Sequence, residues 1–240
     1  MPKKQIFFME RFTFGFVLGF IPKALKYLIY GFISGSVFGI FLFYVNKSLY
    51  QSLLQSWSNR LLFGAQLLNN HYTTWFILNN LVAMIAAIMG ILLILLLIKR
   101  RRHMKRNRFE LFEKHHPRMT LLSLYMIPIG TVFINAFFVS ILLTYVYLSS
   151  GYTELLRAVL ILLPNGLNEI LALLFASSLG LSYLKIIEPL ILKGKWERTI
   201  DVSKKLVFSK TSLHFILFIV ILIVFAAYLE GSAFHLLMRH

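Results

Sequence analysis

Long runs of apolar residues constrain this chain more than any other feature of its sequence. Several runs approach or exceed the roughly 20 residues that a helix needs to cross a bilayer, and 58% of the 240 residues are hydrophobic. A soluble domain of this length has too small a core to bury that much apolar side chain. The sequence therefore predicts an all-α, polytopic helical membrane protein that contacts the lipid bilayer.

The apolar runs give five predicted transmembrane spans within a single integral membrane domain, residues 1–240. The N-terminal segment 1–23 has too short an uncharged part to span, so we expect it to lie at the membrane interface. Residues 47–70 look amphipathic and suit a helix on the membrane surface, with one apolar face made of Leu49, Leu53, Trp57 and Leu61. A short connection at 149–153 separates the third and fourth spans. The spans are predicted at about 27–45, 73–98, 119–148, 164–184 and 212–236.

Basic residues predict which side of the membrane each loop occupies. The chain has 25 Lys and Arg against nine Asp and Glu, and most of the basic residues lie in the N-terminal segment and in the loops 99–118 and 185–210. The positive-inside rule places these three parts in the cytoplasm and the C-terminus outside, in a cell membrane. Loop 99–118 could also bind anionic lipid head groups. Because topology accounts for the net charge, we expect no nucleic-acid partner.

Two pairs of segments share a sequence pattern that predicts a parallel two-span internal repeat. The pairs are "GSVFGIFLF" with "GTVFINAFF", which begin at Gly35 and Gly130, and "NNLVAMIAAIMGI" with "EILALLFASSLGL", which begin at Asn79 and Glu169. A duplication would relate the two halves by an axis along the membrane normal. The alternative is chance similarity between apolar segments. In this alignment Asn79 corresponds to Glu169, and Gly90 corresponds to Gly180.

Glycines recur every four residues along the first span, at Gly31, Gly35 and Gly39. In lipid, helices gain little from hydrophobicity against each other, so close backbone approach at small residues drives their packing. The three glycines therefore predict a helix-packing face. It could dock another span of the same chain, which we favour, or a second copy in a homo-oligomer.

Polar residues inside the apolar runs define a candidate intramembrane site. Such residues are costly in hydrocarbon and usually face protein or a water-filled cavity. The asparagines favour hydrogen bonds that hold the bundle together, each worth about 0.6 kcal/mol. Glu169 favours a solute or ion site, because an unpaired carboxyl there needs a partner, a proton or a cation. The candidate residues are Asn79, Asn80, Asn135, Pro164, Asn165, Gly166, Asn168 and Glu169.

The stretch "LPNGLNE" predicts a broken fourth helix. The apolar run 155–184 would form a helix of roughly 45 Å, too long for one untilted crossing. Pro164 disfavours helix at the preceding residue, and Gly166 allows a change of direction. We therefore expect a short helix at about 153–162 and a span that begins near Asn165. A glutamate at the positive end of such a helix is typical of transporter sites, and it also suits a structural elbow.

No enzyme signature is present in the sequence. It has no phosphate-binding loop, no paired metal ligands at helical spacing within a span, and no cysteine, so thiolate metal sites are excluded. A hydrolase that pairs Ser34 or Ser36 with His214 has no support in the sequence. We expect a non-enzymatic protein without metal or cofactor.

The motif around the proline resembles the signature of the stage II sporulation protein M family. In "LPNGLNEILALLFASSLGL" a proline, a polar residue, a glycine and a downstream glutamate open an apolar helix, and "FILNNLVAMIAAIMGILL" is similar to that family's second span. Pro164, Gly166 and Glu169 match the motif, whereas Asn165 stands where a histidine is expected. The resemblance implies a membrane protein that anchors peptidoglycan-degrading partners.

Two functions follow as expectations. The first is a non-enzymatic scaffold that anchors membrane or envelope protein complexes, as the resemblance, the glycine face and the lack of catalytic residues indicate. The second is a small-solute or ion transporter or channel, with its polar site at the broken fourth helix.

Overall fold

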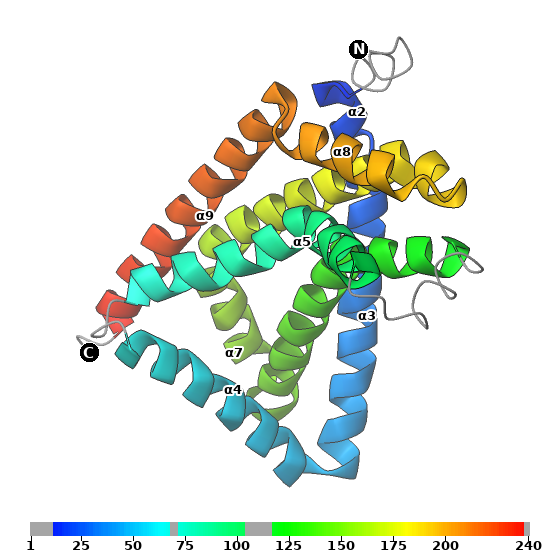
Figure 1. Cartoon of the computed structure of the whole chain (residues 1–240). Coiled ribbons are helices and arrows are strands. Elements are labelled where there is room, and N and C mark those ends of the chain that lie inside the picture. Colours follow the sequence, from blue (N-terminus) through cyan, green and yellow to red (C-terminus); the bar gives the residue numbers. More distant parts are fainter. Residues whose placement is uncertain (1–11, 68–71, 104–116, 238–240) are drawn as a thin grey trace. The chain divides into compact units, whose positions relative to one another are not determined.

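The computed structural model describes residues 12–67, 72–103 and 117–237, and every regular element in these ranges is an α-helix (Figure 1). This confirms the predicted all-α fold class. The helices are α2 (Phe14–Leu18), α3 (Ile21–Val45), α4 (Lys47–Leu67), α5 (Tyr72–His103), α7 (Pro117–Leu192), α8 (Trp196–Val207) and α9 (Lys210–Leu237).

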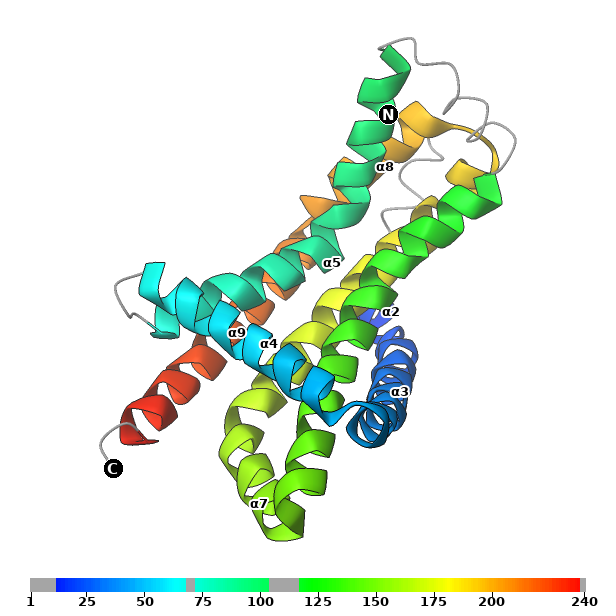
Figure 2. The same cartoon turned by 90° about the horizontal axis from the view of Figure 1, so that it is seen from below.

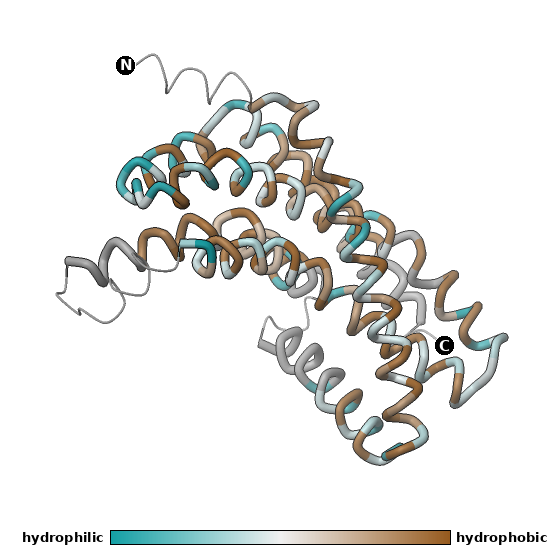
Figure 3. The backbone as a smooth tube through the Cα atoms, turned by 90° about the vertical axis from the view of Figure 1, so that its right-hand side faces the viewer, coloured by the Kyte–Doolittle hydropathy of each residue, from teal (hydrophilic) through white to brown (hydrophobic). Residues whose placement is uncertain are grey.

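Five helical segments in the described part are long and apolar enough to cross a membrane, which confirms a polytopic membrane protein. Apolar residues follow one another along most of these helices (Figure 3). The candidate spans are Phe14–Val45, Ile77–Leu97, Pro117–Leu160, Gly166–Leu192 and Lys210–Leu229.

The first candidate span begins at Phe14, earlier than the predicted residue 27. Gly19, the residue after α2, keeps right-handed helical angles of φ −59° and ψ −15°, so only a short turn separates α2 from α3. Pro22 falls in the first turn of α3, where its missing N–H costs no hydrogen bond. Residues 12–22 therefore join the first candidate span instead of forming a separate interfacial segment, and residues 1–11 lie outside the described part.

The described residues form two compact units, to which α3, α5, α7 and α9 all contribute. Unit 1 comprises the described residues of Met1–Leu25, Ala83–Thr131 and Leu173–Ile219. Unit 2 comprises those of Lys26–Val82, Val132–Ala172 and Val220–His240. All eight residues of the candidate site and the three glycines of the predicted packing face belong to unit 2.

The interruption of α7 lies at Gly151, and the predicted break at Pro164 is wrong. Gly151 has φ 85° and ψ −177°, and the chain reverses there (Figure 2). Residues 163–166 stay helical, so neither a separate helix at 153–162 nor a new start near Asn165 is present. A proline removes one N–H, which a membrane helix can absorb by a local adjustment. The Gly151 angles are accessible almost only to glycine, and they fall inside the predicted connection 149–153.

In unit 2 the glycine face of α3 packs against α7 and α4 of the same chain. Gly31, Gly35 and Gly39 are all buried. A Cβ atom on Gly31 or Gly35 would overlap the carbonyl oxygen of Phe133 or Phe137, and one on Gly39 would lie 2.9 Å from the Tyr50 hydroxyl. At Gly31 and Gly35 the helix backbones therefore approach so closely that only a hydrogen atom fits, whereas Gly39 meets side chains.

In unit 1 a second set of glycines allows a similar approach. A Cβ atom on Gly180 would lie 2.6 Å from the carbonyl oxygen of Ala87 and 3.1 Å from Pro128, and one on Gly90 would lie 3.0 Å from Ile127. Gly90 and Gly180, which the repeat aligns, thus both pack closely against the turn of α7 that contains Ile127 and Pro128.

The amphipathic segment predicted at 47–70 is α4, which is not among the candidate spans. Tyr50 is fully buried, whereas Leu49 and Leu53 of the predicted apolar face are 46% and 50% exposed. The side chains of Trp57 and Leu61 lie outside the described part. The Tyr50 side of α4 therefore contacts protein, and Leu49 and Leu53 remain free to contact lipid.

Most of the predicted cytoplasmic loop 185–210 is helical. Gly151 divides α7 into a first arm, residues 117–150, and a second arm, residues 152–192. The second arm ends at Leu192 in a Schellman motif, in which Gly194 has φ 65°. The Gly194 N–H donates to Ile191 O and the Lys195 N–H donates to Leu190 O, each at 2.9 Å. Helix α8 follows. Only part of loop 99–118 is described, because residues 104–116 lie outside the described ranges.

Replacing Gly35 by alanine should lower the free energy of unfolding by about 1–3 kcal/mol, because the new methyl group would force α3 away from Phe137. Gly130→Ala is the matched control, since a Cβ there meets nothing within 4 Å. It should be neutral or slightly stabilising. Thermal unfolding in detergent measures both variants, and equal melting temperatures would contradict the packing described here.

Replacing Gly151 by alanine should also destabilise the chain, by about 1–3 kcal/mol, because alanine is strained at φ 85°. Gly166→Ala is the control, because Gly166 is helical and has open space at its Cβ position. If the reversal were at residues 163–166 instead, Gly166→Ala would be the more damaging of the two.

Candidate intramembrane polar site

The centre of the candidate site in unit 2 is a hydrogen bond between α5 and the second arm of α7. Asn80 Nδ2 donates to Glu169 Oε1. Both residues are half-buried, and both lie within candidate spans. The bond therefore joins two helices at a depth where an unsatisfied polar group is costly.

Asn79 lies apart from this contact even though the repeat aligns it with Glu169. It is exposed, whereas Asn80 is half-buried. Successive residues of a helix point about 100° apart, so two adjacent asparagines cannot both face one neighbouring helix. The pair "NN" thus places one amide against α7 and the other on the outer surface of unit 2.

The other predicted residues lie on α7, before and after its reversal. Asn135, on the first arm of α7, is exposed, whereas Asn168 and Gly166 are half-buried. Asn135 and Asn168 both take part in interactions. Pro164 and Asn165 are helical in their backbone, and their side chains lie outside the described part. The structure therefore brings Asn80 and Glu169 into direct contact and places Asn79 and Asn135 on the surface.

The chemistry of the pair depends on the charge of Glu169. An amide donates a hydrogen bond to a carboxyl oxygen but brings no positive charge. The ion pairs that the structure shows are elsewhere, between Glu154 and Arg157 at 3.2 Å and between Glu188 and Lys185 at 3.0 Å. Asn80 alone therefore leaves an ionised Glu169 without a counter-charge.

Sequence reasoning missed several polar contacts between helices of unit 2. Ser36 Oγ and Ser140 Oγ are 2.6 Å apart, and Ser140 Oγ also donates to Phe32 O at 2.6 Å. The Tyr50 hydroxyl donates to Ile141 O. Burial raises the pKa of Tyr50 to about 12, so this hydroxyl stays a proton donor at neutral pH. The signal for Ser36 was its place beside Gly35, but nothing in the sequence pointed to Ser140.

Unit 1 contains its own polar contacts. Ser177 Oγ donates to Pro128 O at 2.7 Å, and the Tyr183 hydroxyl donates to Ser212 Oγ at 2.9 Å. Ser212 in turn donates to Leu206 O and so connects α9 with α8. These contacts link α7, α8 and α9 within unit 1.

Among the described residues, no group of three or more His, Cys, Asp or Glu side chains is arranged to hold a metal ion. No protein-family model, curated protein or solved structure matches the chain. The likeness to the stage II sporulation protein M family thus stays an expectation from the sequence motif.

Replacing Asn80 by alanine should lower the free energy of unfolding by about 0.5–2 kcal/mol, because it removes the described donor to Glu169. Asn79→Ala is the matched control on the adjacent residue and should change stability by less than about 0.5 kcal/mol. A double-mutant cycle with Glu169→Ala, measured by unfolding in mixed detergent, should give a coupling energy for Asn80 and none for Asn79. Equal coupling for both asparagines would contradict this assignment.

Proposed function

We propose that the chain is a non-enzymatic integral membrane scaffold that anchors membrane or envelope proteins in a cell membrane. The observation that carries this proposal is helix α8, an ordered helix outside the candidate spans with one buried face and one charged face. Helix α8 belongs to unit 1, and its Trp196, Ile200 and Leu206 side chains are buried.

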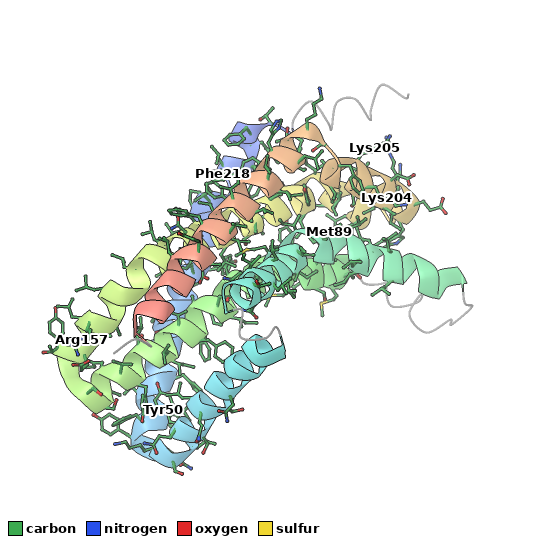
Figure 4. The ribbon with its side chains drawn as sticks, turned by 90° about the vertical axis from the view of Figure 1, so that its left-hand side faces the viewer. Tyr50, Met89, Arg157, Lys204, Lys205 and Phe218 are labelled. Carbon is green, nitrogen blue, oxygen red and sulfur yellow. The ribbon has the colours of Figure 1, made fainter. Side chains whose placement is uncertain are left out.

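The opposite face of α8 carries both signs of charge at helical spacing. Glu197, Asp201, Lys204 and Lys205 are all exposed, and the two lysines project outward from the helix (Figure 4). Residues at i, i+4 and i+7 or i+8 lie along one side of a helix. A loop that only sets topology needs positive charge and no fixed shape. A fixed surface with both signs suits a partner with complementary charges.

The polar contacts inside the helices support the same function. The Asn80–Glu169 and Ser36–Ser140 contacts join helices within unit 2, and the Tyr183–Ser212 contact joins helices within unit 1, as expected of groups that hold a bundle together. The motif at 163–181 adds the resemblance to a family whose namesake anchors other proteins. The charge rule puts α8 on the cytoplasmic side.

A photocrosslinking amino acid at Asp201 should capture a specific membrane protein, through a part that reaches the cytoplasm, in cells that express the full chain. A crosslinker at Leu213, an exposed apolar residue of α9, serves as the control. It should react mainly with lipid and should not capture the protein found at Asp201. Reversing the charge with Asp201→Lys should reduce capture several-fold without changing the melting temperature. Failure to recover any specific protein at Asp201 would count against a scaffold.

A second candidate function, transport of a small solute or ion, is favoured by the Glu169 carboxyl. It lies in a candidate span, and the donor described for it is a neutral amide. Glu169→Gln in proteoliposomes separates the two functions. A transporter would lose its flux with its fold intact, whereas a scaffold has no flux to lose and keeps its crosslinks at Asp201.

A further inference from the structure

A groove of about 530 Å³ lies in unit 2 between α3, α4 and the first arm of α7. Among the described residues, seven hydrophobic side chains and one serine, Ser56, line it. Leu42 and Ile141 form its floor and are 7% and 8% exposed, whereas Phe38, Leu53 and Phe138 border its mouth and are at least 41% exposed. The groove is thus apolar in its depth and open at its side.

The surroundings of the groove place it at the border of the membrane. Helix α4 is not a candidate span, and one residue, Asn46, separates it from the end of the first span. The Asn46 side chain accepts from Leu49 N at 2.9 Å and so caps α4. The rings of Phe43, Tyr50 and Tyr145 form a cluster with centroids 5.0–6.4 Å apart. Tyrosine is enriched at the membrane–water interface.

We propose that this groove binds one acyl chain of a membrane phospholipid. Among the described lining residues only Ser56 is polar, so water in the groove would find few hydrogen-bond partners. The bilayer around the five candidate spans supplies acyl chains at high local concentration. The proposal does not depend on the scaffold function.

The position of Lys47 fits the phosphate of such a lipid. Its Nζ atom lies 4.9 Å from the centroid of the Phe43 ring, and Phe43 packs on the core cluster that contains Leu42 and Ile141. Only the Phe43 ring therefore separates the exposed Lys47 ammonium from the groove floor. An acyl chain bound on that floor would have this cation near its head group.

The size of the groove favours an acyl chain over a protein segment. A helix with its side chains is about 10–12 Å wide, and a stable contact between two protein chains buries about 1,000 Å² or more. A groove of about 530 Å³ falls within the range of small-molecule sites. A single flexible hydrocarbon chain can enter it from the side without moving the helices.

Leu49 and Leu53 provide a matched pair for the test. Both are leucines on the exposed side of α4 with similar exposure, but only Leu53 lines the groove. The full chain is reconstituted in nanodiscs of palmitoyl-oleoyl phosphatidylcholine, and the lipid retained after transfer to detergent is counted by native mass spectrometry. The wild type and Leu49→Trp should retain one lipid per chain. Leu53→Trp should reduce this retention roughly tenfold, equivalent to about 1.4 kcal/mol.

A second measurement keeps the proposal falsifiable if Leu53→Trp fails to fold. A phosphatidylcholine with a diazirine at the end of one acyl chain, irradiated in the same nanodiscs, should label Leu42 or Ile141 on the groove floor of the wild type. Equal retention by the two tryptophan variants, an unlabelled floor, or a dimer without bound lipid would each overturn the proposal.

Discussion

Close approach of helix backbones is the constraint on which the rest of this structure depends. In lipid, a hydrophobic surface does not draw helices together, so contact must come from shape and from polar groups. Gly35 brings α3 against the Phe137 carbonyl, and Gly180 brings α7 against the Ala87 carbonyl. At that separation a side chain as short as serine can bridge two helices. Ser36 reaches Ser140 one residue from Gly35, and Ser177 reaches Pro128 O one turn before Gly180.

The spans and the glycine contacts could be predicted because they depend on composition and on a four-residue period. The reversal within α7 could not be assigned so easily, because Pro164 and Gly151 are both helix-breaking signals. Proline only lacks a donor and can remain inside a continuous membrane helix. Gly151 adopts angles that other residues avoid. Both residues can be read from the sequence. Only the backbone angles show that the helix continues through Pro164 and reverses at Gly151.

The sequence named both Asn79 and Asn80 as candidate residues, but it could not show which of them contacts Glu169. Alignment of the apparent repeat singles out Asn79, but helix phase decides which asparagine faces α7, and that phase is set by packing partners remote in sequence. The same limit applies to α4, where Leu49 and Leu53 follow the expected spacing and yet Tyr50 enters the protein. Periodicity identifies an apolar face, but it does not say whether that face meets protein or lipid.

The two described carboxyl–partner pairs in the last third of α7 differ in one respect that bears on function. Glu188 lies 3.0 Å from the ammonium of Lys185, so its charge is balanced within the chain. Glu169 receives a hydrogen bond from the neutral amide of Asn80, which satisfies an acceptor but balances no charge. If Glu169 holds a proton, the pair is a neutral contact that suits a scaffold. If Glu169 is ionised, a cation must come from outside the pair, and a transported ion could supply it. The protonation state of this one carboxyl therefore decides whether the pair is neutral or carries an unbalanced charge.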